Sequence, residues 1–261
     1  YRERVFAHFL AELRAGRTPS PDVVCNRRIK LGAFVERVGP GWRVASGHYA
    51  RTVERDGLVR LLRGVDPVKD QTYFLSQLDQ GQVRRATFPI GHLTKAEVRL
   101  EAARLGLPNR DRPDSQGICF LGRIPFDDFV AVQLGERPGE IREVESGVVL
   151  GEHRGYWFHT IGQRRGLGLA GGPWYVTGKD VERNLVWVTH GSRLAEHASR
   201  RLLIREPHWI AASPSRPRLE LRVRHTPELV GCEVGPLSGG GLEIHLDRAD
   251  PGLAPGQYAV L

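Results

Sequence analysis

Residues 18–26 read TPSPDVVCN and place a cysteine just inside the predicted start of a helix. Ser20 is a common helix cap, Pro21 suits the first helical position, and apolar residues then recur at roughly helical spacing. The positive end of a helix stabilises a thiolate in its first turn. This stretch therefore predicts an available Cys25 thiolate on a helix that ends near Gly39.

A second cysteine, Cys119, lies in the stretch DSQGICF at residues 114–120. We interpret Cys25 and Cys119 as partners in one reaction. Their spacing alone does not show that the thiols meet, and inert buried cysteines are the alternative. Cys232 has neither an acidic nor a helical setting, which indicates a structural role. No histidine stands at a zinc-ligand interval from a cysteine, so no metal site is predicted.

The 261-residue chain is basic, with 38 Lys and Arg against 30 Asp and Glu and a formal net charge of +8. A basic balance favours an anionic partner such as nucleic acid, through contacts with phosphates. The alternative is that an arginine-rich surface reflects the composition of the source genome. Because the sequence has neither a signal-peptide pattern nor an apolar run of ~18 residues, we expect a cytoplasmic protein that does not contact membranes.

The first half of the chain alternates helical and strand-like patterns, which favours an α/β layer. An opening helix should stop at Gly16, and a capping box joins Thr94 to Glu97 at the start of a later helix. Between them we expect strands at 42–45, 49–53 and 58–62 and a short helix at 72–78.

The pattern changes after residue 123. One helix is expected at 125–134, followed by short strands between glycine-rich turns and by cleaner strand alternation from Arg201 onward. We therefore expect three domains, covering residues 1–123, 124–199 and 200–261, of which the second is β-rich and the third is a small β-barrel.

Two stretches suggest ligand contacts, each with a simpler reading. Gly47 follows a predicted strand, where a glycine lets a ligand approach the backbone, but a plain bend is the alternative. Residues 161–168, IGQRRGLG, combine glycines with Arg164 and Arg165 and favour RNA contact, against the alternative of a solvated turn.

Taken together, the segments resemble the tRNA-specific 2-thiouridylases (MnmA/TrmU family). The matching pieces, in the order of that family, are TPSPDVVCNRRIKLGAF, SGHYA, DPVKDQTYFL, DSQGICFLG, HTIGQRRGLGL and PGQYAV. The resemblance implies an adenine nucleotide alpha hydrolase-like, Rossmann-type α/β domain, then a small β-rich central domain and a C-terminal β-barrel. The family's N-terminal ATP-phosphate loop is not in this sequence, so we expect a truncated chain that binds ATP poorly by itself.

The resemblance also implies a reaction. ATP, with Mg as its expected companion, would adenylate the C2 oxygen of the wobble uridine in tRNA. Cys119 would carry a persulfide received from a sulfur-relay protein or a cysteine desulfurase. Cys25 would attack that persulfide, which releases sulfur and leaves a Cys25–Cys119 disulfide. Asp22 would handle a proton or hold the uracil edge.

The remaining site residues are carried over from the same resemblance. Ser20, Pro21 and Asp22 would contact the target base, Gly47 the nucleotide, and His48 would lie near the tRNA. The other expected tRNA contacts are Lys69, Asp70, Gln71, Arg222, Val223 and Gln257. The family usually has Asn where this chain has Ser20. It usually has an aromatic residue where this chain has Val223, so this chain has no aromatic ring to stack on RNA there. The alternatives are a non-catalytic RNA-binding module with incidental thiols and a thiol–disulfide redox protein.

Overall fold

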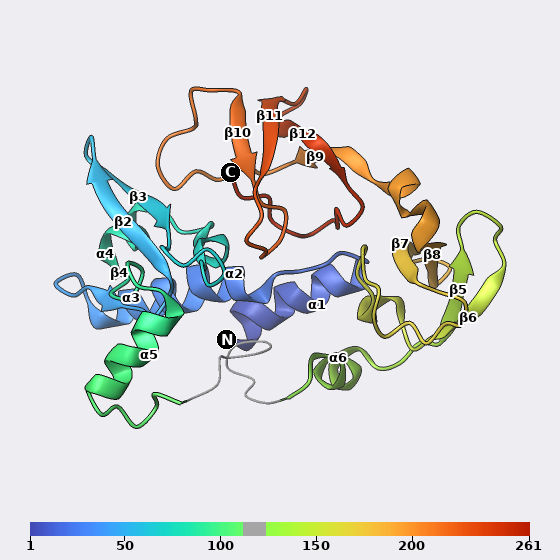
Figure 1. The fold of residues 1–261 in the computed structure, drawn as a ribbon, viewed down its shortest axis with the longest axis horizontal. Coiled ribbons are helices and arrows are strands. Elements are labelled where there is room, and N and C mark those ends of the chain that lie inside the picture. Colours follow the sequence, from blue (N-terminus) through green and yellow to red (C-terminus); the bar gives the residue numbers. More distant parts are fainter. Residues whose placement is uncertain (112–123) are drawn as a thin grey trace.

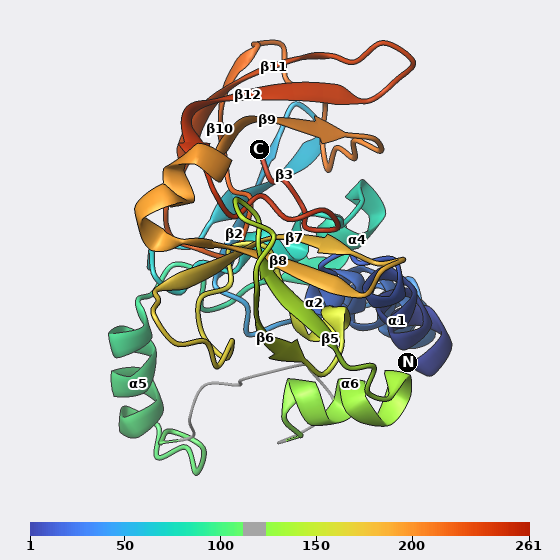
Figure 2. The same ribbon diagram turned by 90° about the vertical axis from the view of Figure 1, so that its right-hand side faces the viewer.

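The computed structural model describes residues 1–111 and 124–261 (Figure 1). Helices of the first third of the chain cross the middle of the view, the central strands lie at one end, and the C-terminal strands lie above. Figure 2 shows the C-terminal strands above the central sheet, with α6 (Phe126–Leu134) below it. In the described ranges, no helix is long and apolar enough to cross a membrane.

Two long helical segments open the chain. A π-helical segment, Arg2–Phe6, continues into α1 (Ala7–Arg14), and the helix ends before Gly16, whose φ of 74° confirms the expected glycine stop. The second segment carries Cys25. It comprises α2 (Pro21–Cys25), the π-helical Asn26–Ala33 and α3 (Phe34–Val38), and it ends at Gly39 as expected.

Short strands complete the α/β part. β1 (Val44–Ala45) pairs in parallel with β4 (Ala86–Thr87), while β2 (Ala50–Arg55) and β3 (Leu58–Arg63) form an antiparallel hairpin. Asp56 and Gly57 both have positive φ, as the tight turn between those strands requires.

Three further helices lie among residues 72–111. The helix expected at 72–78 is only a 3₁₀ turn, Thr72–Leu75. It is followed by α4 (Gln80–Arg85), which the sequence analysis missed although Asp79 and Gln82 form a capping box. The predicted capping box of Thr94 and Glu97 is confirmed at the start of α5 (Lys95–Arg104).

The central part is a four-stranded sheet with the order β6-β5-β8-β7. Its β5–β8 pair is parallel and its other two pairs are antiparallel. The 3₁₀ turns Tyr156–Phe158 and Gly191–His197 flank its strands. Those strands are β5 (Gly139–Glu143), β6 (Val149–His153), β7 (Trp174–Asp180) and β8 (Leu185–His190).

The C-terminal part is an antiparallel sheet with the order β10-β11-β12-β9. A further bridge joins Arg222 to Val260, so the end of the chain returns to the residue after β10. The strands are β9 (Ser199–Ile204), β10 (Arg218–Leu221), β11 (Val230–Pro236) and β12 (Leu242–Asp250).

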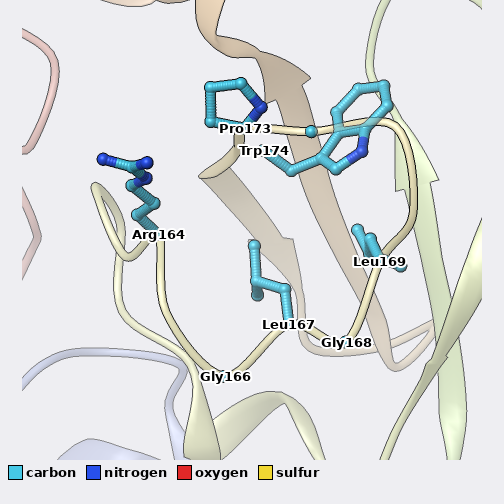
Figure 3. Close-up of a pocket in the computed structure, with 8 residues that line it drawn as sticks. Arg164, Gly166, Leu167, Gly168, Leu169, Pro173 and Trp174 are labelled. Atoms are coloured by element: carbon cyan, nitrogen blue, oxygen red, sulfur yellow. The ribbon is translucent and has the colours of Figure 1, made fainter.

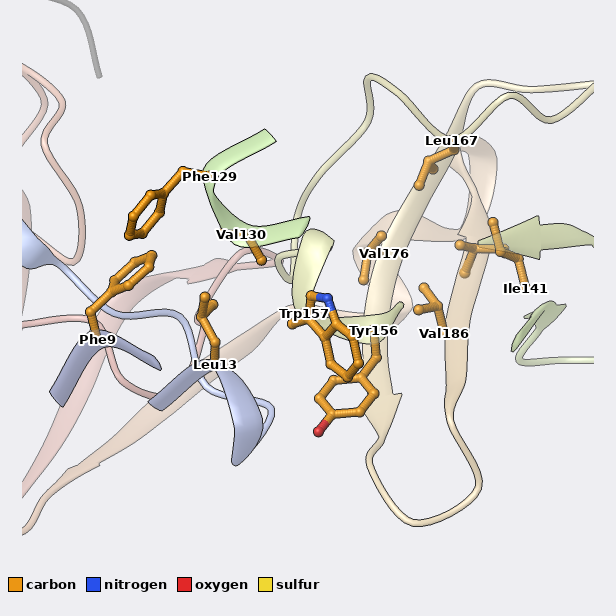
Figure 4. Packing of buried hydrophobic residues seen from close by; sticks show 11 residues of the cluster. Phe9, Leu13, Phe129, Val130, Ile141, Tyr156, Trp157, Leu167, Val176 and Val186 are labelled. Carbon is orange, nitrogen blue, oxygen red and sulfur yellow. The ribbon is translucent and has the colours of Figure 1, made fainter. Parts of the chain in front are cut away.

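The largest apolar core joins the opening helix to the central sheet (Figure 4). Phe9 and Leu13 of α1 pack with Phe129 of α6 and with residues of the central strands. Phe9 is 1% exposed, and its ring lies 6.3 Å from that of Phe129, centroid to centroid. Helix α1 is therefore buried partly by residues beyond position 123, so packing crosses the expected domain boundary, and the boundary itself stays a prediction.

Candidate functional site

The loop between α1 and α2 is held by all three parts of the chain. The Thr18 backbone N–H donates to the Pro255 carbonyl at 2.7 Å, and the Tyr156 hydroxyl donates to the Arg14 carbonyl at 2.5 Å. The hydroxyl of Thr18 also lies 3.5 Å from that of Thr160. The loop that leads into the Cys25 helix therefore lies where the central and C-terminal parts meet the α/β part.

The start of α2 presents the residues expected to meet a target base. Ser20 is the N-cap residue but makes no side-chain capping bond, which differs from the expected cap chemistry. Pro21 is the first helical residue and Asp22 lies in the first turn, and all three residues are partly exposed. They form a short polar edge at a helix entrance, open to a ligand.

Cys25 lies deeper than the sequence suggested. It is the fifth helical residue, past the four whose amides lack partners within the helix, so the dipole acts on it less than expected. Its side chain is 0% exposed and packs with Val5 and Val24. Reaction at this sulfur requires the cover over it to move. Cys119, the expected second thiol, lies outside the described residues.

Gly47 and His48 form the turn between β1 and β2. Gly47 is exposed, and a Cβ added there would meet none of the described residues within 4 Å, so they leave space beside the backbone. His48 is buried, with its Nδ1 2.6 Å from the Ser46 hydroxyl. Burial, assisted by the charge of Lys30, lowers the pKa of His48 to about 4, so the ring is neutral at pH 7.

The motifs SGHYA and DPVKDQ, apart in sequence, are joined by hydrogen bonds. The Gln71 backbone N–H donates to the Tyr49 carbonyl at 3.0 Å, and the Gln71 side-chain oxygen accepts from the Tyr49 N–H at 3.1 Å. Lys69 is partly exposed two residues earlier. These bonds place Gln71 beside Tyr49, the residue that follows His48.

Asp70 and Arg222 are buried against each other. One carboxylate oxygen of Asp70 lies 2.6 Å from Arg222 Nη1, and the other accepts from the Gly64 N–H at 2.9 Å. Both residues were expected to contact tRNA. In this structure neither is open to RNA, because the pair joins the first and last parts of the chain; RNA contact remains a prediction that requires this pair to separate.

The last two expected tRNA contacts lie at the edge of the C-terminal sheet. Val223 is partly buried against the apolar cluster of that sheet, so it offers no exposed ring or side chain for stacking. Gln257 follows a turn whose Gly256 has a φ of 94°. A Cβ on Gly256 would lie 2.9 Å from Arg17 Cβ and 3.0 Å from the Thr18 nitrogen, so this turn rests directly on the loop before α2.

Comparisons with known proteins account for this arrangement. Three domain families match in succession, described as a tRNA methyl transferase HUP domain over residues 1–123, a tRNA methyl transferase PRC-barrel domain over 127–190 and an aminomethyltransferase β-barrel domain over 199–261. The tRNA-specific 2-thiouridylase MnmA 1 of Bacteroides thetaiotaomicron is 47% identical over 100% of this chain and 75% of its own length. The chain belongs to the tRNA-specific 2-thiouridylase family.

Two further thiouridylases match the chain over its whole length. Those of Parabacteroides distasonis and Porphyromonas gingivalis are both 44% identical over the whole of this chain, which spans 74% and 75% of their lengths. The succession of family descriptions agrees with the expected order of an α/β part, a β-rich part and a β-barrel.

The sequence analysis did not identify the residues that position the loop between α1 and α2. Tyr156 and Thr160 each lie 142 positions from the residue that they contact, and Gly256 lies still farther from Arg17, so all three reach this region only through the fold. The glycine in the PGQ turn was the single local signal, because a turn with positive φ favours glycine. Within residues 1–111 and 124–261, no three His, Cys, Asp or Glu side chains gather to hold a metal ion.

Proposed function

We propose that this chain carries out 2-thiolation of the wobble uridine of tRNA. The observation that carries the proposal is the helix entrance Ser20–Asp22, which leads to Cys25 and is held where three domains meet, in a chain 47% identical to a named tRNA-specific 2-thiouridylase. A substrate that touches all three domains would be centred on this loop.

ATP is the expected co-substrate, and the described residues fit a nucleotide in one respect. Exposed Gly47 leaves its backbone open to a ligand, and the neighbouring His48 is neutral and adds no charge there. When bound, ATP supplies the group that turns the C2 oxygen of uridine into a good leaving group. The backbone at Gly47 would hold the nucleotide, and the helix entrance at Asp22 would orient the uracil.

The sulfur step uses the two cysteines. Cys119 carries a persulfide, whose terminal sulfur comes from a sulfur-relay protein or a cysteine desulfurase. The Cys25 thiolate attacks the inner sulfur, the sulfur–sulfur bond of the persulfide breaks, and hydrosulfide leaves to replace the oxygen at C2. The product is a Cys25–Cys119 disulfide, which a thiol reductant must open before the next cycle.

The remaining assignments concern tRNA binding, which we propose takes place in the cytoplasm. Gln71 is hydrogen-bonded to Tyr49, next to His48, with Lys69 two positions before it, and Gln257 follows the Gly256 turn that rests on the Thr18 loop. A net charge of +8 favours an anionic polymer as substrate. Asp70 and Arg222 would join the contact only after their ion pair opens.

One observation favours a second candidate, a non-catalytic RNA-binding protein. Cys25 is 0% exposed, as expected of an incidental thiol in an apolar cluster. The two candidates differ in the expected effect of Cys25→Ser, which removes the nucleophile but keeps a side chain of similar size. If the chain thiolates tRNA, the substitution abolishes thiolation and leaves RNA binding unchanged. If the chain only binds RNA, the substitution changes nothing.

The test restores the full-length protein to bacteria that cannot thiolate tRNA and measures 2-thiouridine by nucleoside mass spectrometry. Cys25→Ser and Cys119→Ser should each abolish the product. Cys232→Ser is the matched control, because Cys232 is equally buried but lies in the C-terminal sheet. Thiolation that persists in either of the first two variants refutes the two-thiol mechanism, and tRNA binding without thiolation in the wild type favours the second candidate.

A further inference from the structure

The glycine-rich loop of the central domain is an ordered structure. Gln163 fastens it from within: its side-chain oxygen accepts from the Thr160 N–H at 2.9 Å, and its side-chain amide donates to the Arg165 carbonyl at 2.9 Å. The Gln163 carbonyl also accepts from the Val176 N–H on β7 at 3.0 Å. The residues that follow Gln163 are therefore presented to solvent in a fixed geometry.

A pocket of about 360 Å³ lies between this loop and the start of β7 (Figure 3). Arg164 stands on one side of it and the indole of Trp174 on the other. The indole N–H donates to the Ala170 carbonyl at 2.8 Å, and the edge of the ring meets His190, so the ring is held in place. A fixed aromatic ring at the wall of an open pocket is a suitable platform for a nucleobase.

The positive charge on the loop is not neutralised by any acidic residue that the structure describes. Arg164 and Arg165 are exposed, and neither forms an ion pair or side-chain hydrogen bond with any residue that the structure describes. The neighbouring Arg154, in contrast, is neutralised by Glu136 and Asp127. Two adjacent arginines without acidic partners favour a phosphate group as ligand.

The loop is rooted beside the proposed reaction centre. Thr160, at its base, lies 3.5 Å from the hydroxyl of Thr18, two residues before Ser20. Gly162 rests against Gly252 of the C-terminal part, since a Cβ on Gly162 would lie 2.9 Å from the Gly252 Cα. Nucleotides that flank a base held at Ser20–Asp22 would therefore pass close to this loop.

We infer that the pocket between Arg164 and Trp174 binds one nucleotide of the tRNA adjacent to the target uridine. Its base packs on Trp174 and Pro173, and its phosphate meets Arg164 and Arg165. The inference rests on the proposed function, because it takes tRNA as the substrate. It adds a subsite in the central domain, on the glycine-rich loop whose base is Thr160.

Binding of unmodified tRNA to the full-length protein, measured across a range of salt concentrations, tests this subsite. The double variant Arg164→Ala/Arg165→Ala should weaken binding about tenfold or more and lower the slope of log affinity against log salt by about 1 to 2. Arg37→Ala is the matched control: Arg37 is exposed on α3, at the other end of the molecule, and has no ion pair with any residue in the described ranges. It should leave the affinity within about twofold.

Stacking is tested separately at Trp174. Trp174→Leu should weaken binding about fivefold or more without changing the salt slope, whereas Trp174→Phe should retain most of the affinity. Thermal unfolding of each variant shows whether the fold is kept. If the arginine and Trp174→Leu variants bind as the wild type does, the inference is wrong and the proposed function stands. If the wild type binds no tRNA, both fall.

Discussion

The guanidinium of Arg222 lies 2.6 Å from the carboxylate of Asp70, with 4% and 0% of the two side chains exposed. Two guanidinium nitrogens of Arg222, Nε and Nη2, have no hydrogen-bond partner among the residues that the structure describes. A buried charge that is only partly hydrogen-bonded depends strongly on its single counter-ion. This pair is therefore a point at which the α/β part and the C-terminal part hold each other in position.

Removing the carboxylate should destabilise the protein. Asp70→Asn preserves the shape of the side chain but leaves Arg222 charged and buried, so we expect a loss of about 3–5 kcal/mol in the free energy of unfolding, measured by chemical denaturation. Glu101→Gln is the control, because it breaks an ion pair with Arg104 that is exposed to solvent and should leave the midpoint unchanged. Equal midpoints for the two variants would contradict the role given to Asp70.

A methyl group at Gly256 should disturb the reaction more than the fold. Gly256→Ala would force the Cβ to within 2.9 Å of Arg17 Cβ and shift the loop that leads to Ser20. Because small displacements of reacting groups are costly, we expect the single-turnover rate constant of thiolation to fall about 10- to 100-fold, with tRNA affinity changed much less. The assay is single-turnover thiolation of tRNA.

Gly239→Ala provides the comparison for Gly256. Gly239 has a similar φ of 88°, but a Cβ there would meet nothing within 4 Å, so the variant carries the backbone strain without the contact. It should lose stability through the backbone strain and retain activity. Identical activities in the two variants would show that the Gly256 turn does not position the loop.

The buried His159 should make the protein sensitive to acid. Burial, with smaller contributions from the charges of His153, Lys179 and Arg154, lowers the pKa of His159 from 6.5 to about 4. The unfolded chain therefore takes up a proton at higher pH than the folded chain. The contribution of His159 to stability is therefore fully present above pH 6.5. The free energy of unfolding falls by up to about 3 kcal/mol as the pH drops to 4.

His159→Gln tests whether His159 causes this loss of stability at low pH. It removes one proton from the difference between the unfolded and folded states, so its stability should fall less steeply between pH 6.5 and 4 than that of the wild type. His48, whose pKa is also about 4, continues to contribute in both proteins. Parallel stability curves over this range would exclude His159 as a source of the acid sensitivity.

Phe9 tests whether α1 and the central sheet form one core. Phe9→Ala removes a ring that is 1% exposed and packed beside Phe129, so we expect a loss of about 3–5 kcal/mol. The thermal midpoint of the central sheet should fall together with that of the helices, measured by near- and far-UV circular dichroism. Val132→Ala, at a side chain that is 81% exposed on α6, should change neither. Separate transitions would mean that the two parts fold independently.

Local rules explain which features the sequence could predict. The stop at Gly16 and the capping box at Thr94 each depend on a few neighbouring residues, and each was predicted correctly. The capping box of Asp79 and Gln82 at the start of α4 follows the same local rule, so α4 could have been predicted from the sequence.

Other features depend on the assembled fold. The partners Asp70 and Arg222 are separated by 152 positions, and no local pattern distinguishes a buried aspartate from one that meets a phosphate. The burial of Cys25 likewise depends on Val5 from another helix. The family resemblance indicated which residues belong to the site, but only the fold shows which of them now face one another.

The loop between α1 and α2 is fixed at both ends, and this limits how its length can vary. α1 is buried against Phe129, while Thr18 is held by Pro255. One inserted residue would have to be accommodated by displacing the entrance of α2 or by lifting Thr18 from the Pro255 carbonyl. A surface turn such as that at Gly239 has open space around it and can absorb such an insertion. Insertions and deletions should therefore be tolerated at the tip of the C-terminal sheet and excluded between Ala15 and Ser20.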